Sequence, residues 1–378
     1  MKELLISLVR AAAGNLPAGG VEILRTELDK LQEGQWKELF ELASRQGVAA
    51  FVWDTLEGLV NDSGLRIPRE LMLGWAGVAM SYEQRYLKYT LSIGRLARLL
   101  ASHGVGTMVL KGYCSSLDWP VPAHRPCGDI DIWNFGEQQK ADGIVASKGI
   151  KVDGSHHHHT VFFIGGFMVE NHYDFINVHA HRSSAQIEKK LKRLAGEEGR
   201  LIKMPDTAGR DGAVIPGGQI VAPPVQFNAL FLIAHLAAHF GGEDITLRQL
   251  LDWAFFVRAS AGAIDWKTLQ ENCRRWNKIR LLDAVNAICV RYLGFEESLF
   301  PVSQRDEKLE DRIFADILEP EFSEAEPAKK SLLRTIPFKY RRWKSHRWKN
   351  EIVYPEKPLP MMLRLVWSHL LKPSSMLD

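Results

Sequence analysis

The stretch RPCGDIDIW, residues 125–133, places Asp129 and Asp131 one residue apart between two isoleucines. The alternation of polar and apolar residues in DIDIW predicts a β-strand. Alternate side chains of a strand share a face, so Asp129, Asp131 and Trp133 are expected together, with the isoleucines anchored in a core on the other side. Two carboxylates this close repel one another unless a cation lies between them, and their oxygen atoms suit Mg²⁺ or Mn²⁺. The competing interpretation places both aspartates in solvent on an edge strand.

The overall composition is that of an ordinary globular protein and narrows the classes of function. The chain has 378 residues, of which 46% are hydrophobic and 25% are charged, so a disordered chain is excluded and two or three domains are expected. A net charge of +3 is too small to indicate a nucleic-acid-binding protein by itself. The four cysteines lack metal-ligand spacing and are expected as free thiols in a reducing compartment. With no signal peptide and no apolar stretch of roughly 20 residues, the sequence predicts a cytoplasmic protein without a membrane partner.

The spacing of apolar residues divides the chain into three regions. Residues 1–105 show helical spacing, residues 106–220 mix short strand candidates with helices, and residues 221–378 are again helical. We therefore expect an α/β (α+β) fold in which a mixed-sheet domain lies between two helical regions. Further predicted features are a helix stop at Gly104, strands at 106–110, 149–152 and 160–164, a hairpin turn at Gly165–Gly166, a helix break at Gly241–Gly242, an N-cap at Asp265 and a last helix at 361–371.

A lysine and a glycine follow an apolar run upstream of the aspartate pair. In VLKG, residues 109–112, the order strand, glycine turn and helix predicts a phosphate site built from backbone N–H groups, with Lys111 as an added cation beside Gly112. The alternative is an ordinary strand-to-helix turn. Gly128, which directly precedes the pair, would let a substrate approach the backbone closely.

A further carboxylate comes from FMVENHYDF, residues 167–175. With the period of a strand, Met168, Glu170, His172 and Asp174 share one face. Such a row of polar residues is hard to explain as core, although a solvated face is the alternative. Beside the aspartate pair, it predicts a third metal ligand with polar neighbours.

Taken in this order, the segments resemble the nucleotidyltransferase superfamily related to DNA polymerase β. Within it, the sequence is similar to a bacterial group labelled uncharacterised nucleotidyltransferases, over about residues 36 to 260. Many superfamily members carry a small residue after the glycine of the phosphate turn, whereas Tyr113 follows here, a feature that the group shares. The corresponding pieces are Lys111–Gly112, Arg125 with Gly128–Asp131, Glu170 with His172, His235 with His239, and Leu247–Arg248 with Leu251–Asp252.

The resemblance implies a Mg²⁺-dependent (or Mn²⁺-dependent) transfer of a nucleoside monophosphate from an NTP to a hydroxyl of an acceptor, a small molecule or a protein. It implies that Asp129, Asp131 and Glu170 bind the metal and catalyse the transfer, with Glu170 as general base and Asp174 in reserve. The residues that it places against the nucleotide are Lys111, Gly112, Arg125, Gly128 and Arg248. Those that it places near the acceptor or behind the acids are His172, Asp174, His235 and His239.

Several of these features have other interpretations. His235 and His239 are four residues apart on one helix face, so they could bind zinc or simply line the cleft or a domain interface. Arg125 could be solvated, and Arg248 could form a surface ion pair with Asp252. The histidine run 156–159 is expected in a solvated loop or at a strand start, with weak adventitious metal binding.

A different class of function is also open. The basic and aromatic segment 339–349 could contact RNA or DNA through its cations and stack bases on its rings. The alternative to an enzyme is therefore a catalytically inactive protein of the same fold that binds nucleotide or RNA.

Overall fold

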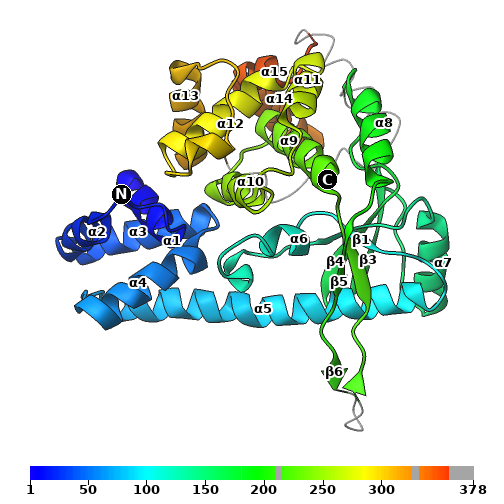
Figure 1. Ribbon diagram of the computed structural model, residues 1–378, viewed down its shortest axis with the longest axis horizontal. Helices are drawn as coiled ribbons and strands as arrows, with labels where there is room; N and C mark the ends of the chain where they lie inside the picture. Colours follow the sequence, from blue (N-terminus) through cyan, green and yellow to red (C-terminus); the bar gives the residue numbers. More distant parts are fainter. Residues whose placement is uncertain (180, 209–213, 325–331, 357–378) are drawn as a thin grey trace.

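One long helix organises the molecule. The computed structural model describes residues 1–179, 181–208, 214–324 and 332–356. The helix α5 (Arg69–Ala101) runs horizontally in Figure 1, with the first four helices at one end and the sheet at the other. The later helices cluster above it in the same view. The predicted fold class, a mixed sheet between helical regions, is confirmed.

The N-terminal helices form because their apolar residues recur at helical spacing. For example, α3 buries Trp36, Leu39 and Leu42 on one face. Gly47 follows it with a φ of +67°, a left-handed conformation that glycine adopts without strain, and the chain then turns into the next helix. Gly104, with a φ of +73°, follows the end of α5 as predicted. The helices before α5 are α1 (Lys2–Ala12), α2 (Gly20–Asp29), α3 (Glu33–Arg45) and α4 (Ala49–Ser63).

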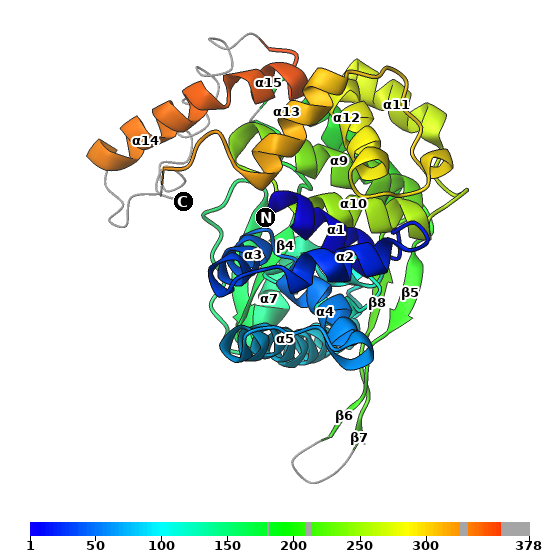
Figure 2. The same cartoon turned by 90° about the vertical axis from the view of Figure 1, so that its left-hand side faces the viewer.

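The sheet has six strands in the order β3-β4-β2-β1-β8-β5. The aspartate strand β2 lies in its interior, parallel to β4 and antiparallel to β1, so the edge-strand interpretation is wrong. The strands are β1 (Met108–Val109), β2 (Ile130–Trp133), β3 (His159–Ile164), β4 (Phe167–His172), β5 (Arg200–Lys203) and β8 (Gln219–Ala222). Two short strands, β6 (Thr207–Ala208) and β7 (Val214–Ile215), form a separate hairpin that projects from the body (Figure 2).

The predicted hairpin turn at Gly165–Gly166 is present, whereas the strand predicted at 149–152 is not. Gly165 and Gly166 both have positive φ and join β3 to β4 in an antiparallel hairpin, as predicted. The strand expected at 149–152 is wrong, because this segment follows the helix α7 (Gln138–Ser147) as a turn and an irregular stretch. Only Asp153 makes an isolated bridge, to Val161.

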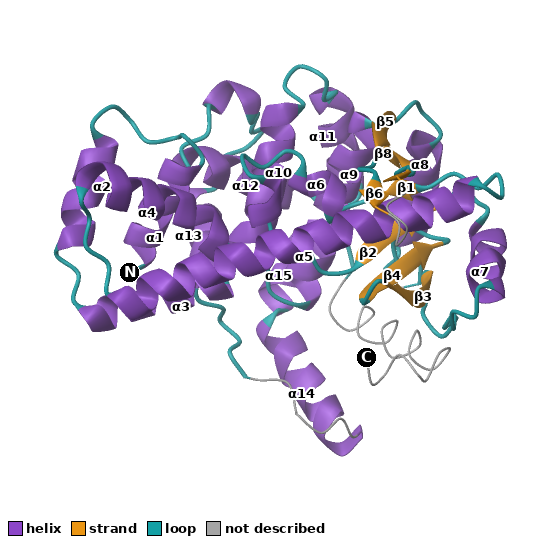
Figure 3. Cartoon of the chain, turned by 90° about the horizontal axis from the view of Figure 1, so that it is seen from below, coloured by secondary structure: helices purple, strands orange, loops and turns teal. Residues whose placement is uncertain are grey.

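The two faces of the sheet have different partners. Ile130, Ile132 and Val169 pack on one face against α5 and α7 in an apolar cluster. Trp133, with Met108 and Leu110, belongs to a second cluster that contains the apolar residues of α9 (Val225–Gly242). The aspartate strand therefore presents its isoleucines to one core and its other face to the core that contains α9. Figure 3 shows the sheet from below, at one end of α5.

The C-terminal helices begin and end near the capping residues and glycines that the sequence predicted. The helix α9 ends at Gly242, and α10 begins after a capping box in which Thr246 and Gln249 hydrogen-bond reciprocally. The Asp265 carboxylate accepts the N–H of Thr268 at 3.0 Å, which confirms it as an N-cap. The helix predicted at 361–371 lies outside the described residues. The remaining elements are α6 (Tyr113–Ser116), α8 (Ser184–Ala195), α10 (Leu247–Ala259), α11 (Trp266–Arg275), α12 (Ile279–Arg291), α13 (Glu307–Leu318), α14 (Leu332–Ser345), α15 (Arg347–Val353) and the 3₁₀ turns Pro122–His124 and Glu297–Leu299. Within the described residues, every helix is too short or too polar to cross a membrane.

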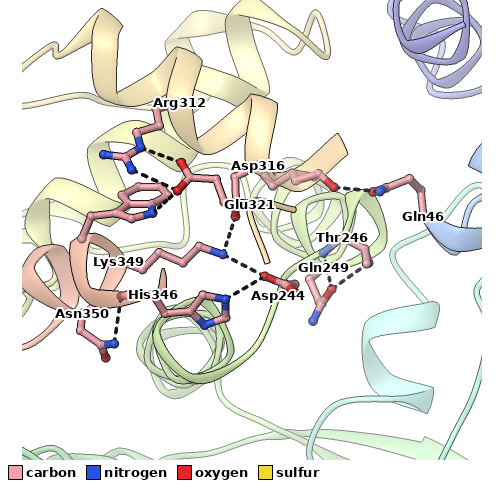
Figure 4. Close-up of polar contacts among 12 residues, drawn as sticks. Gln46, Asp244, Thr246, Gln249, Arg312, Asp316, Glu321, His346, Lys349 and Asn350 are labelled. Atoms are coloured by element: carbon pink, nitrogen blue, oxygen red, sulfur yellow. Dashed lines mark hydrogen bonds and ion pairs between the residues drawn. The ribbon is translucent and has the colours of Figure 1, made fainter. Parts of the chain in front are cut away.

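A buried lysine ties α15 to the body (Figure 4). The ammonium group of Lys349, which is fully buried, lies 2.9 Å from Asp244 and 2.5 Å from Asp316, on the segment after α9 and on α13. His346 lies 3.4 Å from the same Asp244 carboxylate. Because Lys349 and Asp316 are buried together and Asp244 is half-buried beside them, the opposite charges compensate one another's desolvation.

Candidate active site

Two acids meet across neighbouring strands. Asp131 on β2 and Glu170 on β4 are direct partners in the parallel register, so their side chains leave the same face of the sheet side by side. Asp131 is buried, at 2% exposure, and Glu170 is partly exposed. Asp129 lies just before β2 and is also partly exposed. Burial, and then the charge of Asp131, raise the pKa of the Asp129 carboxyl.

A lysine and a histidine compensate the buried aspartate. Oδ1 of Asp131 lies 3.0 Å from the Lys111 ammonium group and 3.1 Å from Nε2 of His172. Burial alone would raise the pKa of Asp131, but Lys111 and His172 lower it well below its usual range. Burial likewise lowers the pKa of His172, but hydrogen bonds to Asp131 and to Glu170, 3.5 Å away, raise it to about 9. The charges of the three acids also raise the pKa of Lys111 against its burial, so this lysine stays a cation.

The glycine after Lys111 is required by close packing. Gly112 has a φ of +53°, and a Cβ atom there would lie 2.4 Å from the Tyr89 hydroxyl. That hydroxyl donates a hydrogen bond of 2.7 Å to the carbonyl of Asp129, so the turn at Gly112 is held against the start of β2. The helix α6 that follows is a single turn of four residues, much shorter than the helix expected for a phosphate site. The role of a helix dipole at this turn is correspondingly small.

Two arginines approach the acids from different positions. Arg125 is buried, at 5% exposure, and its guanidinium binds Asp252 on α10 through two hydrogen bonds of 2.7 and 2.9 Å. It is therefore not solvated, and Asp252 does not pair with Arg248 as the surface-pair interpretation expected. A phosphate contact of Arg125 stays a prediction. Trp119 donates a further hydrogen bond of 2.9 Å to Asp252. This buried network anchors α10 to the loop that leads into β2.

Arg248 lies outside the network formed by Arg125, Asp252 and Trp119. It has no ion pair among the described residues, and burial, and then the charge of Arg125, lower the pKa of its guanidinium. The attraction of Asp129 opposes this shift. Gln46 positions the start of α10, because its side chain accepts the N–H of Leu247 at 2.9 Å and its carbonyl accepts the N–H of Arg248 at 3.2 Å. A partly buried cation that lacks a carboxylate partner suits an anionic ligand.

The paired histidines of α9 face the same region. Nε2 of His235 lies 3.0 Å from Nε2 of His239, whose Nδ1 lies 3.0 Å from Glu243. Burial, and then the charge of Lys111, lower the pKa of His235 well below its usual range, so it is a neutral imidazole at pH 7. Neither histidine belongs to a metal-capable group of three ligands within the described residues. Zinc binding at this pair would therefore lack a third protein ligand among the described residues, and a place along a cleft or a domain interface stays a prediction.

Two groups of side chains can hold a metal ion in the described part of the chain. One contains Asp131, Glu170 and His172, and the other contains His158, His159 and His172; in each, the ligand atoms lie within 4.8 Å of one another. His159 is the first residue of β3 and is buried, at 8% exposure. The strand start that the sequence offered for the histidine run is therefore confirmed at this position, although the side chain is buried rather than solvated. Burial, and then the charge of His172, lower the pKa of both His158 and His159 to about 3.

The reserve acid and the glycine before the pair stand apart from the metal-capable groups. Asp174 lies beyond the end of β4, and its carboxylate pairs with Lys192 on α8. Gly128 is exposed, and a Cβ atom there would meet nothing within 4 Å. A cavity of about 680 Å³, lined by Trp133, Tyr173 and Lys192 among others, opens at the carboxyl end of β2 and β4. Its volume is in the range of small-molecule sites.

Much of the basic segment 339–349 is used within the molecule. Lys349 is buried as described above, and Arg341 forms an ion pair of 2.8 Å with Glu324. The Trp348 ring packs under the guanidinium of Arg312, 3.9 Å away, and its N–H donates to Glu321. Tyr340 is 54% exposed on α14, which extends away from the other helices (Figure 2). Part of the segment therefore supports the fold, although the sequence pattern suggested a contact surface.

The sequence predicted the three acids and Lys111, but the role of Tyr89 and two sets of contacts depend on the tertiary fold. Tyr89 lies on a long helix whose pattern indicates only packing, so no signal pointed to it. The buried pairing of Arg125 with Asp252 joins residues 127 positions apart and depends on the tertiary fold. His158 and His159 were visible in the sequence, but only the hairpin register opposite His172 brings them beside the acids.

Adjacent carboxylates on a mixed sheet and a lysine before a glycine turn therefore lie together, with a group of ligands that could hold a metal ion. Residues 32–294 match the family described as uncharacterised nucleotidyltransferases, and the chain belongs to that family. It is accordingly a nucleotidyltransferase with an unknown acceptor. No curated protein and no solved structure matches the chain.

Proposed function

We propose that this protein transfers a nucleoside monophosphate from an NTP to a hydroxyl of an acceptor, in a reaction that depends on Mg²⁺ or Mn²⁺. The observation that carries the proposal is the pairing of Asp131 with Glu170 on neighbouring parallel strands, within a group that can hold a divalent ion. Carboxylate oxygens are the ligands that these hard ions prefer. The family supplies the chemistry that such a site performs.

The residues present fit a divalent ion. Asp131 and Glu170 would hold it, and Asp129 would join them from the start of β2, because burial and the charge of Asp131 disfavour its ionised form until a cation is near. Such an ion, when bound, supplies charge neutralisation for the phosphate oxygens and polarises the attacking hydroxyl.

In the proposed reaction the acceptor oxygen attacks the α-phosphorus, and the bond to the β-phosphate oxygen breaks to release pyrophosphate. Glu170, the more exposed acid of the pair, takes the hydroxyl proton as general base. Lys111 and Arg248 bind the triphosphate, and the two cations balance the charge that pyrophosphate carries away. His172 contacts both acids and holds Asp131 in place. Positioning and electrostatics therefore account for most of the protein's contribution.

The test uses nucleotide binding, because the acceptor is unknown. Titration calorimetry with a non-hydrolysable NTP is run with Mg²⁺ and with EDTA. We expect metal-dependent binding that Glu170→Gln weakens by about tenfold or more. Asp174→Asn is the matched control, because it removes a carboxylate from the same strand segment that pairs with Lys192 instead. Binding that is independent of metal, or equally weakened by both substitutions, would contradict the proposal.

The RNA-binding alternative predicts a different result. It requires salt-dependent binding of RNA with affinity that falls steeply between low and moderate salt. Gel shifts with single-stranded RNA at two salt concentrations distinguish it from the transferase. A cytoplasmic location stays a prediction of the sequence.

A further inference from the structure

Three imidazole rings converge beside the acids, and the proposed reaction does not use two of them. His159 is the register partner of His172 in the β3–β4 hairpin, and His158 directly precedes the strand. The ring centroids are 4.5 Å apart for His158 and His159, 5.5 Å for His158 and His172, and 5.2 Å for His159 and His172. One ring nitrogen of each lies within 4.8 Å of the others.

The bonding of these rings is incomplete. Nδ1 of His158 and Nδ1 of His159 are both buried, and neither has a hydrogen-bond partner among the described residues. A buried polar atom without a partner costs about 1–3 kcal/mol, and two in one cluster require an explanation. A metal ion that accepts ring lone pairs from the cluster would supply the missing interactions.

The surroundings of His172 match those of a metal ligand. Its Nδ1 lies 3.1 Å from the carbonyl of Asp174, so a proton on Nδ1 is donated to that carbonyl. Its Nε2 lies 3.1 Å from Oδ1 of Asp131 and becomes a metal ligand when a bound ion displaces its proton. Glu170 Oε1 lies 3.7 Å from Nε2 of His159, although it belongs to the carboxylate group rather than to the three histidines. Nitrogen-rich sets of this kind favour zinc and similar ions, whereas Mg²⁺ prefers oxygen. Three histidines with one remaining position is a known zinc arrangement.

We propose that His158, His159 and His172 form a second metal site, which binds Zn²⁺ or a similar transition-metal ion next to the carboxylate site. The site lies outside the proposed transferase chemistry, because it needs neither nucleotide nor acceptor. It shares His172 with the carboxylate group, so the two sites are adjacent within one face of the sheet.

The sequence provides a control for the test, because four histidines stand in a row and only His158 and His159 of these offer ligand atoms to the cluster. The His156 ring stacks on that of His159 at 4.8 Å, so this control also tests whether stacking alone supports binding. The variant His158→Ala/His159→Ala removes the two that belong, and His156→Ala/His157→Ala removes the same number from the same run. Protein stripped with EDTA is titrated with Zn²⁺ against a chelating dye, and with Co²⁺ while the visible absorption of the bound ion is recorded. No nucleotide is present, so the outcome is independent of the proposed function.

We expect one equivalent of Zn²⁺ to bind wild type and His156→Ala/His157→Ala with similar affinity. His158→Ala/His159→Ala should lose more than about 100-fold in affinity, together with the Co²⁺ absorption band, because it removes two direct ligands. Equal loss in both double variants would mean adventitious binding by the run and would overturn the proposal, as would a wild-type protein that binds no Zn²⁺. If the buried His159 is needed for folding, the partly exposed His158→Ala alone must still weaken binding by about tenfold or more.

Discussion

Asparagine substitutions at Asp131 and Asp129 should have different effects on stability, although both should abolish metal-dependent nucleotide binding. The Asp131 carboxylate is 2% exposed and contacts Lys111 at 3.0 Å and His172 at 3.1 Å. Asp131→Asn keeps the shape of the side chain but leaves both cations without their anionic partner. Breaking a buried ion pair in this way costs about 3–5 kcal/mol of unfolding free energy.

The pKa of His172 gives a second value for the free energy that its contacts with the acids contribute to stability. Its rise from 6.5 to about 9, at about 1.4 kcal/mol per pKa unit, corresponds to about 3 kcal/mol by which the attraction of the two acids exceeds the opposing effects of burial and Lys111. Part of this belongs to Glu170, so the share of Asp131 in the His172 interaction is smaller. The contact of Asp131 with Lys111 contributes in addition, and we expect Asp131→Asn to lower the unfolding free energy by about 3 kcal/mol in total.

Asp129 differs because the fold does not stabilise its charge. Burial and Asp131 raise the pKa of Asp129, and its backbone carbonyl, rather than its carboxylate, accepts the Tyr89 hydroxyl. Asp129→Asn removes one of two repelling charges, so the unfolding free energy should stay within about 0.5 kcal/mol of wild type or rise slightly. The metal should nevertheless lose a ligand.

The assay is urea unfolding of the metal-free proteins in EDTA at pH 7, combined with calorimetric titration of a non-hydrolysable NTP in Mg²⁺. Both variants should lose metal-dependent binding, and only Asp131→Asn should unfold at clearly lower urea. If Asp131→Asn is as stable as wild type, the charge pairing at this site has been misjudged. Full nucleotide binding by both variants would refute the assignment of the aspartates as metal ligands.

Three further predictions concern cations elsewhere in the chain. Burial lowers the pKa of Lys278 from 10.5 to about 8. Between pH 8 and 10.5 only the unfolded chain holds this proton, so the unfolding free energy should rise by up to about 3 kcal/mol over this range. In denaturant titrations, Lys278→Met should flatten that rise and should be more stable than wild type at pH 7. Lys349→Ala leaves Asp244 and Asp316 without their shared cation and should lower the unfolding free energy by about 3–5 kcal/mol in thermal or urea unfolding. A loss below about 1 kcal/mol would contradict a stabilising buried pair between Lys349 and Asp316. Arg248→Gln should weaken NTP binding by about tenfold, which corresponds to about 1.4 kcal/mol. It should not lower the unfolding free energy at pH 7, because burial already disfavours the charge of this guanidinium. Unchanged affinity in calorimetry would exclude Arg248 from the phosphate site.

Local patterns predicted the elements in which neighbouring residues decide the outcome. The glycine pair at Gly165 and Gly166 has the positive φ angles that a tight hairpin turn needs, so the β3–β4 hairpin could be predicted. Asp265 could be predicted as an N-cap because capping involves residues only three apart. The segment 149–152 has strand-like composition but does not extend the single bridge that Asp153 makes to β3, and propensity alone does not make a strand.

The sequence by itself determined which faces carry chemistry. The period of two in residues 129–133 and 167–172 separates apolar from polar side chains, and this separation holds in any sheet that contains the two strands. Only the tertiary structure decided which polar residues meet. The parallel register sets Asp131 beside Glu170, the hairpin brings His158 and His159 to His172, and α10 delivers Asp252 to Arg125 rather than to Arg248. The physical reason is that electrostatic partners are selected by distance in space, whereas a sequence pattern records only distance along the chain.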